Sequence, residues 1–272
     1  QTITVTGANL TPGRWYVTPV NTGGGDASVN VSATITASTG TLKVKGGSYY
    51  PPNRGGHGIF MYPAGAEQAV LWYTYFQDGT PTWYYMQAPQ PGANGSWATP
   101  IYRASWNGSN NHLVEVGEAV MTAVTDSQFS FAYNLDGFTG VESMDAFLTG
   151  CPTISGQPVD ASGNWFDPVR AGSGYSVQLS PNYEFFAAFI YDDLGLPRFL
   201  AAERGGAFNA GAGAIQLDQL QGFAPLGAHT APVRSPVGTL SRQFTANALS
   251  GISVNASFAN GIAGSWNAND AV

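Results

Sequence analysis

The chain is poor in charge and in cysteine, and it contains no long apolar run. Charged residues make up 10% of its 272 residues, against about 25% in an ordinary soluble domain. Only two of them are lysines, Lys43 and Lys45, and the ten basic residues are scattered along a chain with a net charge of -7. Because phosphate groups are neutralised by clustered Lys and Arg, we expect no nucleic acid partner.

No apolar stretch approaches the roughly 20 residues of a membrane-spanning helix, so we expect no membrane insertion. The chain opens at Gln1 without the charged and apolar regions of a signal peptide, and we expect a mature or excised form. Cys151 is the only cysteine, which excludes an intrachain disulfide and a cysteine-based metal cluster. We expect no metal site and no cofactor. Two roles for Cys151 stay open: a small core or loop residue, or a thiol that pairs with another chain.

Glycine, serine, threonine and asparagine supply the polarity that charge does not, and aromatic residues reach 13% of the chain. A neutral surface rich in hydroxyl and amide groups, combined with many rings, is typical of a secreted or surface-displayed β protein. We therefore expect the chain to act outside the cell.

The chain contains an internal copy of itself. "GSYYPPNRGGHGI" (47–59) returns as "GNWFDPVRAGSGY" (163–175), and "YFQDGTPTW" (75–83) returns as "YDDLGLPRF" (191–199), at a constant offset of 116 residues. A repeat of this kind decides the architecture before any other pattern does. The identical pairs are Gly47/Gly163, Pro52/Pro168, Arg54/Arg170, Gly56/Gly172, Gly58/Gly174, Tyr75/Tyr191, Gly79/Gly195 and Pro81/Pro197.

Most of these pairs are Gly or Pro, and several others exchange one ring for another, as Tyr49/Trp165 does. The copies therefore share turn geometry and bulk, whereas Arg54/Arg170 is the one charged pair that both keep. A reaction centre present in both copies would be expected to keep its polar residues. The repeat consequently predicts architecture far better than chemistry.

Alternation of apolar and polar residues at period 2 dominates and indicates half-buried antiparallel strands. "SVNVSATIT" (28–36), "QFSFAYNL" (128–135) and "GISVNASF" (251–258) show it, and the last two occupy corresponding late positions in the two copies. The best helical candidate, Leu113 to Val124, is too short and apolar to be distinguished from a strand by its pattern.

Two strands, "AVLWYTYF" (69–76) and "EFFAAFIY" (184–191), are apolar on both faces. This pattern is consistent with burial on both sides or with an aromatic interior. Each runs into a Gly/Pro turn, "QDGTP" or "DLGLP", and so predicts a hairpin.

We expect an all-β fold of two tandem antiparallel domains, barrel-like or sandwich, with six to eight strands each. Closure into a barrel is favoured because it removes exposed edges. The predicted domains are an N-terminal β segment (1–46), a first repeat (47–150) and a second repeat (151–272).

The repeat resembles one found in secreted proteins of proteobacteria, with the pattern GxW[FY][DN]PxxxGxG followed by YxxxGxPxW. The second copy keeps Trp165, Asp167 and Pro168 but has Phe199 where the pattern has Trp, while the first copy keeps Trp83. The resemblance implies an uncharacterised accessory domain, often appended to hydrolases. The N-terminal "PGRWYVTPVN" (12–21) is weakly similar to bacterial pre-peptidase-type β domains.

No catalytic residue is assigned. The chain has no GxSxG elbow, no HExxH zinc pair and no P-loop, and its three histidines lie in loop-like contexts. A Ser-His-Asp triad assembled from distant positions stays an alternative, because triads are recognised by geometry rather than by order.

The most suggestive local group is "WFDPVRAGSG" (165–174). A turn at Pro168 would let the Asp167 carboxylate accept hydrogen bonds from the Arg170 guanidinium or from backbone N–H groups. The structural alternative is a pair that locks a loop. The functional alternative is a ligand site at a barrel mouth, for which the candidate residues are Trp165, Asp167, Arg170, Tyr175 and Arg54.

Surplus rings in the first copy are either core filler or a platform that stacks on sugars. Trp97 and Trp106 lie beside "NGS" motifs and are the rings we expect to be exposed. The acidic loops "YDDLG" (191–195) and "NLDG" (134–137) are read as hairpin turns rather than calcium sites.

The favoured function is a secreted or cell-surface, non-catalytic module that binds a glycan or a surface protein. Two alternatives remain: a secreted hydrolase with a site between the repeats, and a self-associating subunit of an extracellular assembly or filament whose N-terminal strands pair with a neighbour.

Overall fold

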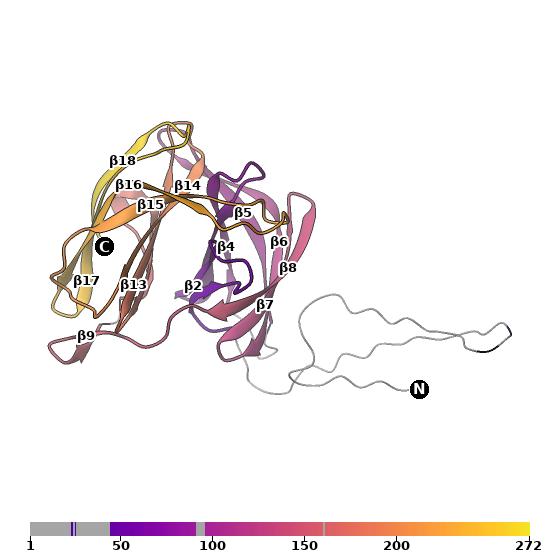
Figure 1. Ribbon diagram of the computed structural model, residues 1–272, viewed down its shortest axis with the longest axis horizontal. Helices are drawn as coiled ribbons and strands as arrows, with labels where there is room; N and C mark the ends of the chain where they lie inside the picture. Colours follow the sequence, from indigo (N-terminus) through magenta and orange to yellow (C-terminus); the bar gives the residue numbers. More distant parts are fainter. Residues whose placement is uncertain (1–22, 24, 26–43, 91–95, 160) are drawn as a thin grey trace.

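The computed structural model describes residues 23, 25, 44–90, 96–159 and 161–272, and almost all of their regular structure is β-strand (Figure 1). The predicted N-terminal segment, with its strand "SVNVSATIT", lies almost entirely outside these ranges. Within them, no helix has the length and apolar character needed to cross a membrane.

The first repeat is a closed eight-stranded barrel in which each strand pairs with the next one along the chain. Its first and last strands close the ring through the pairs Tyr49–Ala146 and Tyr50–Asp145. The strands are β1 (Gly47–Tyr50), β2 (Gly58–Ala64), β3 (Glu67–Tyr75), β4 (Pro81–Pro89), β5 (Ser96–Trp106), β6 (Asn111–Thr125), β7 (Gln128–Leu135) and β8 (Phe138–Ala146).

The second repeat is an eight-stranded antiparallel sheet that curls around its own core without closing. Strand β11 ends after three residues because Asp167 and Pro168 begin the 3-10 helix η2 (Pro168–Arg170). The other strands are β12 (Gly174–Ser180), β13 (Tyr183–Tyr191), β14 (Pro197–Gly205), β15 (Ile215–Gln221), β16 (Val233–Thr245), β17 (Ala248–Ser257) and β18 (Ser265–Ala271), and β11 itself is Gly163–Trp165. A two-stranded hairpin, β9 (Thr153–Ile154) and β10 (Gln157–Pro158), precedes them.

The all-β prediction of two barrel-like domains is confirmed, but full closure holds only for the first. The bounds of β2, β3 and β4 differ from those of β12, β13 and β14 by 116 residues throughout, which matches the offset in the sequence. Both Gly/Pro turns form hairpins, with Gly79 at φ 80° and Gly195 at φ 73°. The ambiguous stretch from Leu113 to Val124 is part of strand β6.

Each repeat has an inner core built by the alternating pattern. In β7 the inward residues Phe129, Phe131, Tyr133 and Leu135 are buried and the intervening residues are partly exposed. The corresponding strand β17 buries Leu249, Ile252, Val254 and Ala256 in the core of the second sheet.

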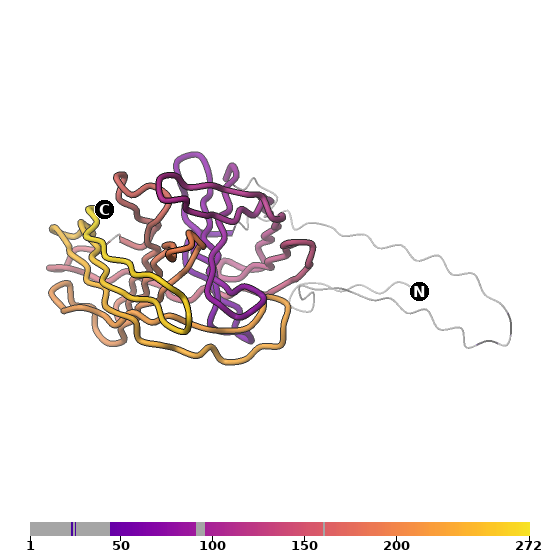
Figure 2. The backbone as a smooth tube through the Cα atoms, turned by 90° about the horizontal axis from the view of Figure 1, so that it is seen from above, coloured from indigo at the N-terminus to yellow at the C-terminus, as the bar shows by residue number. Residues whose placement is uncertain are grey.

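The outer faces of β3, β4, β13 and β14 form a third core, because the two repeats pack against each other there (Figures 1 and 2). This explains why β3 and β13 are apolar on both faces. In β13, for example, Phe186 belongs to the core of its own sheet, whereas Phe185 and Phe189 face the first barrel.

The contacts between the repeats are reciprocal, as a two-fold axis would make them. The N–H of Gly222 donates to the carbonyl of Gly79, and the N–H of Trp106 donates to the carbonyl of Gly195, both at 2.9 Å. Residues 79 and 106 are related to residues 195 and 222 by the same offset of 116. Inside each repeat the equivalent residues Tyr75 and Tyr191 also make equivalent hydrogen bonds, donating to the carbonyls of Gly56 and Gly172.

The rings at this interface obey the same relation. Trp83 lies 5.8 Å from Phe189 and 5.7 Å from Tyr191 between ring centroids, and its counterpart Phe199 lies 5.4 Å from Tyr73 and 5.9 Å from Tyr75. The closed barrel and the curled open sheet thus pack as an internal pseudo-symmetric dimer.

Candidate functional site

A pocket of about 490 Å³ lies between the two repeats and is the best candidate for a ligand site. We call it the inter-repeat pocket. Ligand sites are typically concave, largely apolar and located between domains, and this pocket has all three properties. It is lined by Pro63, Ala64, Ala69, Leu71, Trp83, Tyr85, Asn111 and Leu113 of the first repeat and by Asn164, Trp165, Phe166, Ala171, Gly172, Ser173, Gly174, Tyr175 and Phe189 of the second.

The pocket exists because the pseudo-symmetry is broken at two positions. On the other side of the axis, Phe60 and Phe185 stack with their ring centroids 5.3 Å apart and are both buried. Their counterparts, 116 residues away, are Ser176 and Ala69. Two rings are therefore replaced by a hydroxymethyl and a methyl group, and the space on this side stays open.

The pocket offers rings and neutral hydrogen-bonding groups. None of its lining residues is charged. Trp83 and Trp165 supply ring surface, and Phe166 is 56% exposed. Asn164, whose Oδ1 accepts a hydrogen bond of 2.6 Å from Ser176, supplies an amide. An uncharged ligand that presents a ring or another flat apolar face fits this chemistry.

Of the residues expected around Pro168, the structure places only some at the pocket. Trp165 and Tyr175 line it. Asp167 instead caps η2, accepting from the N–H of Val169 at 2.9 Å, which is the backbone alternative predicted for this carboxylate. Arg170 turns away and pairs with Asp270 at 2.7 Å. The expected site at a barrel mouth is therefore replaced by one between the barrels.

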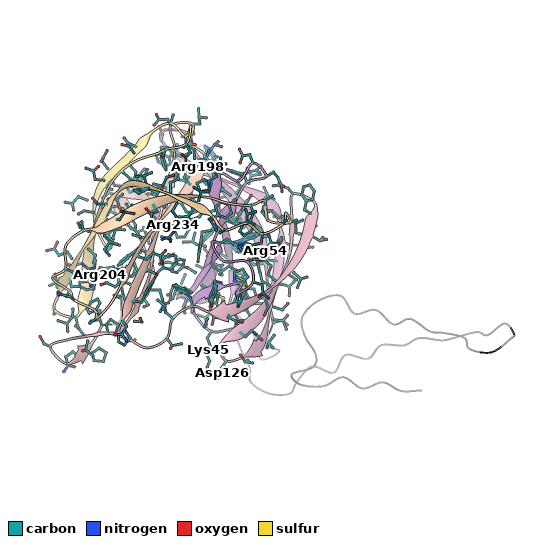
Figure 3. The ribbon with its side chains drawn as sticks, in the orientation of Figure 1. Lys45, Arg54, Asp126, Arg198, Arg204 and Arg234 are labelled. Carbon is teal, nitrogen blue, oxygen red and sulfur yellow. The ribbon has the colours of Figure 1, made fainter. Side chains whose placement is uncertain are left out.

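Arg54 lies on the opposite side of the pseudo-symmetry axis, in contact with the loop 222–232 of the second repeat. Its Nη2 donates to the carbonyl of Pro225 at 2.6 Å, and its guanidinium lies 4.9 Å from the centre of the Phe223 ring. Arg54 and Arg198, which donates to the carbonyl of Pro81, each reach across to the other repeat (Figure 3). We therefore assign Arg54 a structural role between the repeats rather than a role in ligand binding.

A buried polar pair lies beneath Arg54. The Nε2 atom of His57 is 3.3 Å from a carboxylate oxygen of Glu142, and both side chains are almost fully buried. Burial is the main cause that lowers the pKa of His57 to about 3, assisted by the charges of Arg54 and His229. Burial also raises the pKa of Glu142 to about 7, although Arg54 opposes that rise.

These two pKa shifts predict opposite pH dependences of stability. A histidine whose folded pKa is lowered from 6.5 to about 3 makes the unfolded state bind more protons in that range, so its contribution to stability rises with pH. A carboxyl group whose folded pKa is raised from 4.5 to about 7 makes the folded state bind more protons, so its contribution falls as pH rises. Between pH 4.5 and 6.5 these two pH dependences have opposite signs, so together they should leave the stability of the unsubstituted chain nearly constant.

Single substitutions at His57 and Glu142 should separate the two pH dependences. We expect the free energy of unfolding of Glu142→Gln to rise with pH between 4.5 and 6.5, by roughly 1 kcal/mol per pH unit, and that of His57→Gln to fall over the same range. Urea unfolding at several pH values measures both slopes, with the unsubstituted chain as the flat reference. Slopes of the same sign in the two variants would contradict the assignment.

The expectation that Trp97 is exposed is wrong. Its side chain is 3% exposed, lies in the core of the first barrel and donates from Nε1 to the carbonyl of Pro89 at 2.8 Å. It occupies an inward-facing position of β5, so it cannot stack on a ligand. Trp106 is half-buried and stacks on Tyr191 at 6.2 Å between centroids. Most of the aromatic side chains of the first repeat therefore lie in a core, which is one of the two alternatives stated above.

The histidines do not form a catalytic triad in the described part of the chain. His57 contacts a carboxylate but no serine hydroxyl, His112 bonds Asn107, and His229 bonds the carbonyl of Gly55. Nor do three His, Cys, Asp or Glu side chains gather as metal ligands among the residues described. Cys151 is free and exposed.

The acidic loops are hairpin turns. Asp192 accepts from the N–H groups of Leu194 and Leu196, each at 2.9 Å, and from Arg198. Asp136 has a positive φ of 49° in the turn between β7 and β8. The Asp192 carboxylate thus holds its own turn, whereas the Asp136 carboxylate pairs with Arg103 of β5 at 3.4 Å.

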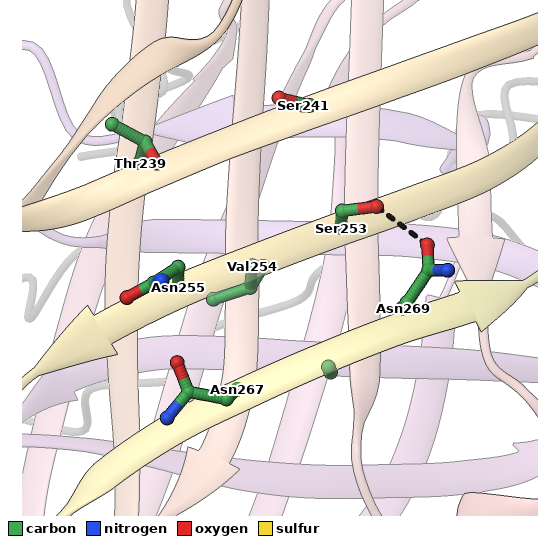
Figure 4. A pocket seen from close by; sticks show the side chains of 8 residues that line it. Thr239, Ser241, Ser253, Val254, Asn255, Asn267 and Asn269 are labelled. Atoms are coloured by element: carbon green, nitrogen blue, oxygen red, sulfur yellow. Dashed lines mark hydrogen bonds between the residues drawn. The ribbon is translucent and has the colours of Figure 1, made fainter.

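A second hollow, of about 450 Å³, lies on the outer face of β16, β17 and β18 (Figure 4). Its exposed side chains are hydroxyls and amides, and Ser253 donates to Asn269 at 2.6 Å. These residues alternate with core residues such as Leu240 and present no ring. The hollow therefore lacks the aromatic surface that the inter-repeat pocket offers.

Comparison with known proteins gives no relative. No family model matches the chain, and no curated protein and no solved structure matches it. A functional interpretation must therefore come from the site itself.

Proposed function

We propose that the chain is a non-catalytic binding module, secreted or displayed on the cell surface, whose ligand binds in the inter-repeat pocket. The ligand is a glycan or a segment of a surface protein. The observation that carries the proposal is the lining of the pocket, which combines rings with amide and hydroxyl groups and contains no charge. Such a lining suits recognition of a neutral ligand, and it contains no carboxylate, histidine or cysteine.

The location outside the cell is supported by composition. A chain with 10% charged residues, many hydroxyl and amide side chains and 13% aromatics is typical of extracellular β proteins. The likeness of the repeat to accessory domains of secreted proteins supports the same location. The two copies do not present two equal sites, because the groove on the other side of the axis is filled by Phe60 and Phe185.

The pocket can be tested by filling it with the ring that its counterpart carries. Ala69→Phe places a phenylalanine where the equivalent residue is Phe185, and we expect it to abolish ligand binding while leaving the fold intact. Ala132→Phe, on the outer face of β7 away from the pocket, is the matched control. Panels of neutral oligosaccharides and of capped aromatic peptides would be titrated while tryptophan fluorescence is recorded, because Trp83 and Trp165 line the pocket.

A probe that binds the unsubstituted chain and Ala132→Phe, but binds Ala69→Phe at least tenfold more weakly, supports the proposal. If nothing in either panel binds, or if binding is the same in Ala69→Phe, the proposed function is wrong.

A further inference from the structure

We propose that the inter-repeat pocket and the adjacent free edge of β11 bind an extended segment of a partner polypeptide that carries an aromatic side chain. The inference rests on the proposed function and selects one of its two ligand classes. It comes from comparing the open groove with its filled counterpart across the pseudo-symmetry axis.

The filled groove holds a third ring, which is supplied by an extended segment of chain. Phe147 follows strand β8, and its ring centroid lies 5.4 Å from Phe185, 5.5 Å from Tyr50 and 5.8 Å from Tyr183. The ring therefore enters the space between the repeats and packs on residues from both of them.

The backbone of the same segment extends the ladder on the edge of β1. After the pairs Tyr49–Ala146 and Tyr50–Asp145, the N–H of Phe147 donates to the carbonyl of Ser48 at 2.9 Å. Since the N–H of Ser48 also bonds outward, to Gln178 at 3.3 Å, both backbone groups of Ser48 point to this edge. One polypeptide segment thus binds the Ser48 carbonyl at this edge and fills the groove with its ring, while Gln178 binds the Ser48 N–H.

The equivalent edge in the second repeat has no strand. Within the described ranges β11 pairs with β12 alone, and no ladder joins it to β18. Asn164 is the counterpart of Ser48, so its N–H and C=O point to the edge that β12 does not occupy, on a half-buried strand that also contacts β2 of the first repeat. Phe166, the counterpart of Tyr50, lines the pocket and is 56% exposed. The backbone C=O and N–H of Asn164 and the ring of Phe166 therefore all lie beside an open pocket.

An exposed strand edge binds extended peptides through backbone hydrogen bonds, and neighbouring pockets select the side chains. Here the pocket lacks charge and has lost two rings relative to its counterpart, so the side chain that fits is an uncharged aromatic one. A sugar could stack on Trp165, but it could not continue the ladder of β11. The edge is what favours a peptide over a glycan.

The test uses the full chain and a peptide that copies the filled groove. The probe is the capped heptapeptide SMDAFLT, residues 143–149 of this chain, and its control carries Ala in place of Phe. We expect the heptapeptide to bind with a change in tryptophan fluorescence, and the control peptide to bind at least tenfold more weakly. Ala69→Phe in the protein should reduce binding to a similar extent, whereas Ala132→Phe should not.

A second pair of variants separates the edge from the pocket. Asn164→Ala removes only the amide that lines the pocket, whereas Asn164→Pro also removes the edge N–H, and proline is tolerated on edge strands. We expect Asn164→Pro to bind the peptide several-fold more weakly than Asn164→Ala. Hydrogen exchange on the unsubstituted chain should show slower exchange at Asn164 when the peptide is bound. Unchanged exchange, or equal binding of the control peptide, would overturn the inference.

Other outcomes separate this inference from the proposed function. If neutral oligosaccharides bind in the pocket and the peptides do not, the peptide inference is wrong and the binding function stands. If neither class binds, both are wrong. A dimer of the chain alone that Ala69→Phe dissociates, seen by analytical ultracentrifugation, would identify the occupant as a second copy and overturn the partner assigned here.

Discussion

Gly195→Ala should destabilise the chain by about 3 kcal/mol or more, at or above the upper end of the ordinary range for a single substitution. Gly195 has a φ of 73°, a left-handed conformation that costs an L-residue about 1–2 kcal/mol. An added Cβ would also collide with the carbonyl of Trp106 in the other repeat. The clash falls on a contact where the Trp106 N–H donates to Gly195, so the hydrogen bond, whose net contribution is about 1 kcal/mol, is lost as well.

Gly65→Ala is the matched control. Gly65 has a similar φ of 66° in the turn between β2 and β3, but a Cβ there meets nothing within 4 Å. We expect it to cost only the backbone penalty of about 1 kcal/mol. Chemical denaturation of both variants measures the difference, and the reciprocal Gly79→Ala should resemble Gly195→Ala. Equal costs for Gly65→Ala and Gly195→Ala would mean that the repeats do not depend on this contact.

Much of the fold was predictable from the repeat and from periodicity. The offset of 116 residues reappears in the bounds of β2 to β4 and β12 to β14, because Gly and Pro fix the turns that separate these strands. The apolar faces of "AVLWYTYF" and "EFFAAFIY" indicated burial on both sides, and the two strands do face each other's repeat. Backbone geometry and burial are local signals, so a single sequence carries them.

The acidic residues with which the two shared arginines pair were not predictable from the sequence. The shared arginines find acids on the last strands of their own repeats, Glu142 for Arg54 and Asp270 for Arg170. These acids do not stand 116 residues apart, because the connections before the last strands differ in length. The "NGS" motif beside Trp97 predicted an exposed ring, but Trp97 lies in strand β5, where its side chain points into the barrel.

The candidate site was hidden for a related reason. The difference that opens the pocket is the loss of two rings, Ala69 in place of Phe185 and Ser176 in place of Phe60. No local pattern marks these positions, and only the packing of the repeats shows that Phe60 and Phe185 stack across the axis. Trp165 and Tyr175 were predicted because they lie in the repeated stretch 163–175, while Leu71, Leu113 and Phe189 were missed because nothing local distinguishes them from core residues.

The buried charges of the second sheet lead to the other large expected effect. Arg242 is fully buried and holds Glu184 through two hydrogen bonds of 2.7 Å, while its remaining donors reach the carbonyls of Ala212 and Asn209. Glu184 also accepts from Arg204. Removing one member of a buried pair leaves the other charge in a low-dielectric interior, which costs about 3–5 kcal/mol.

Arg242→Met should therefore lower the free energy of unfolding by about 3–5 kcal/mol, measured by urea denaturation at neutral pH. Lys45→Met is the control, because its ion pair with Asp126 is exposed at the end of the first barrel (Figure 3) and should contribute at most about 1 kcal/mol. The double variant Arg242→Met/Glu184→Leu should recover part of the loss, since it removes the stranded carboxylate along with its partner. A double variant less stable than Arg242→Met would show that Glu184 gains most of its stabilisation from Arg204, and that Arg242 acts through the two carbonyls it binds.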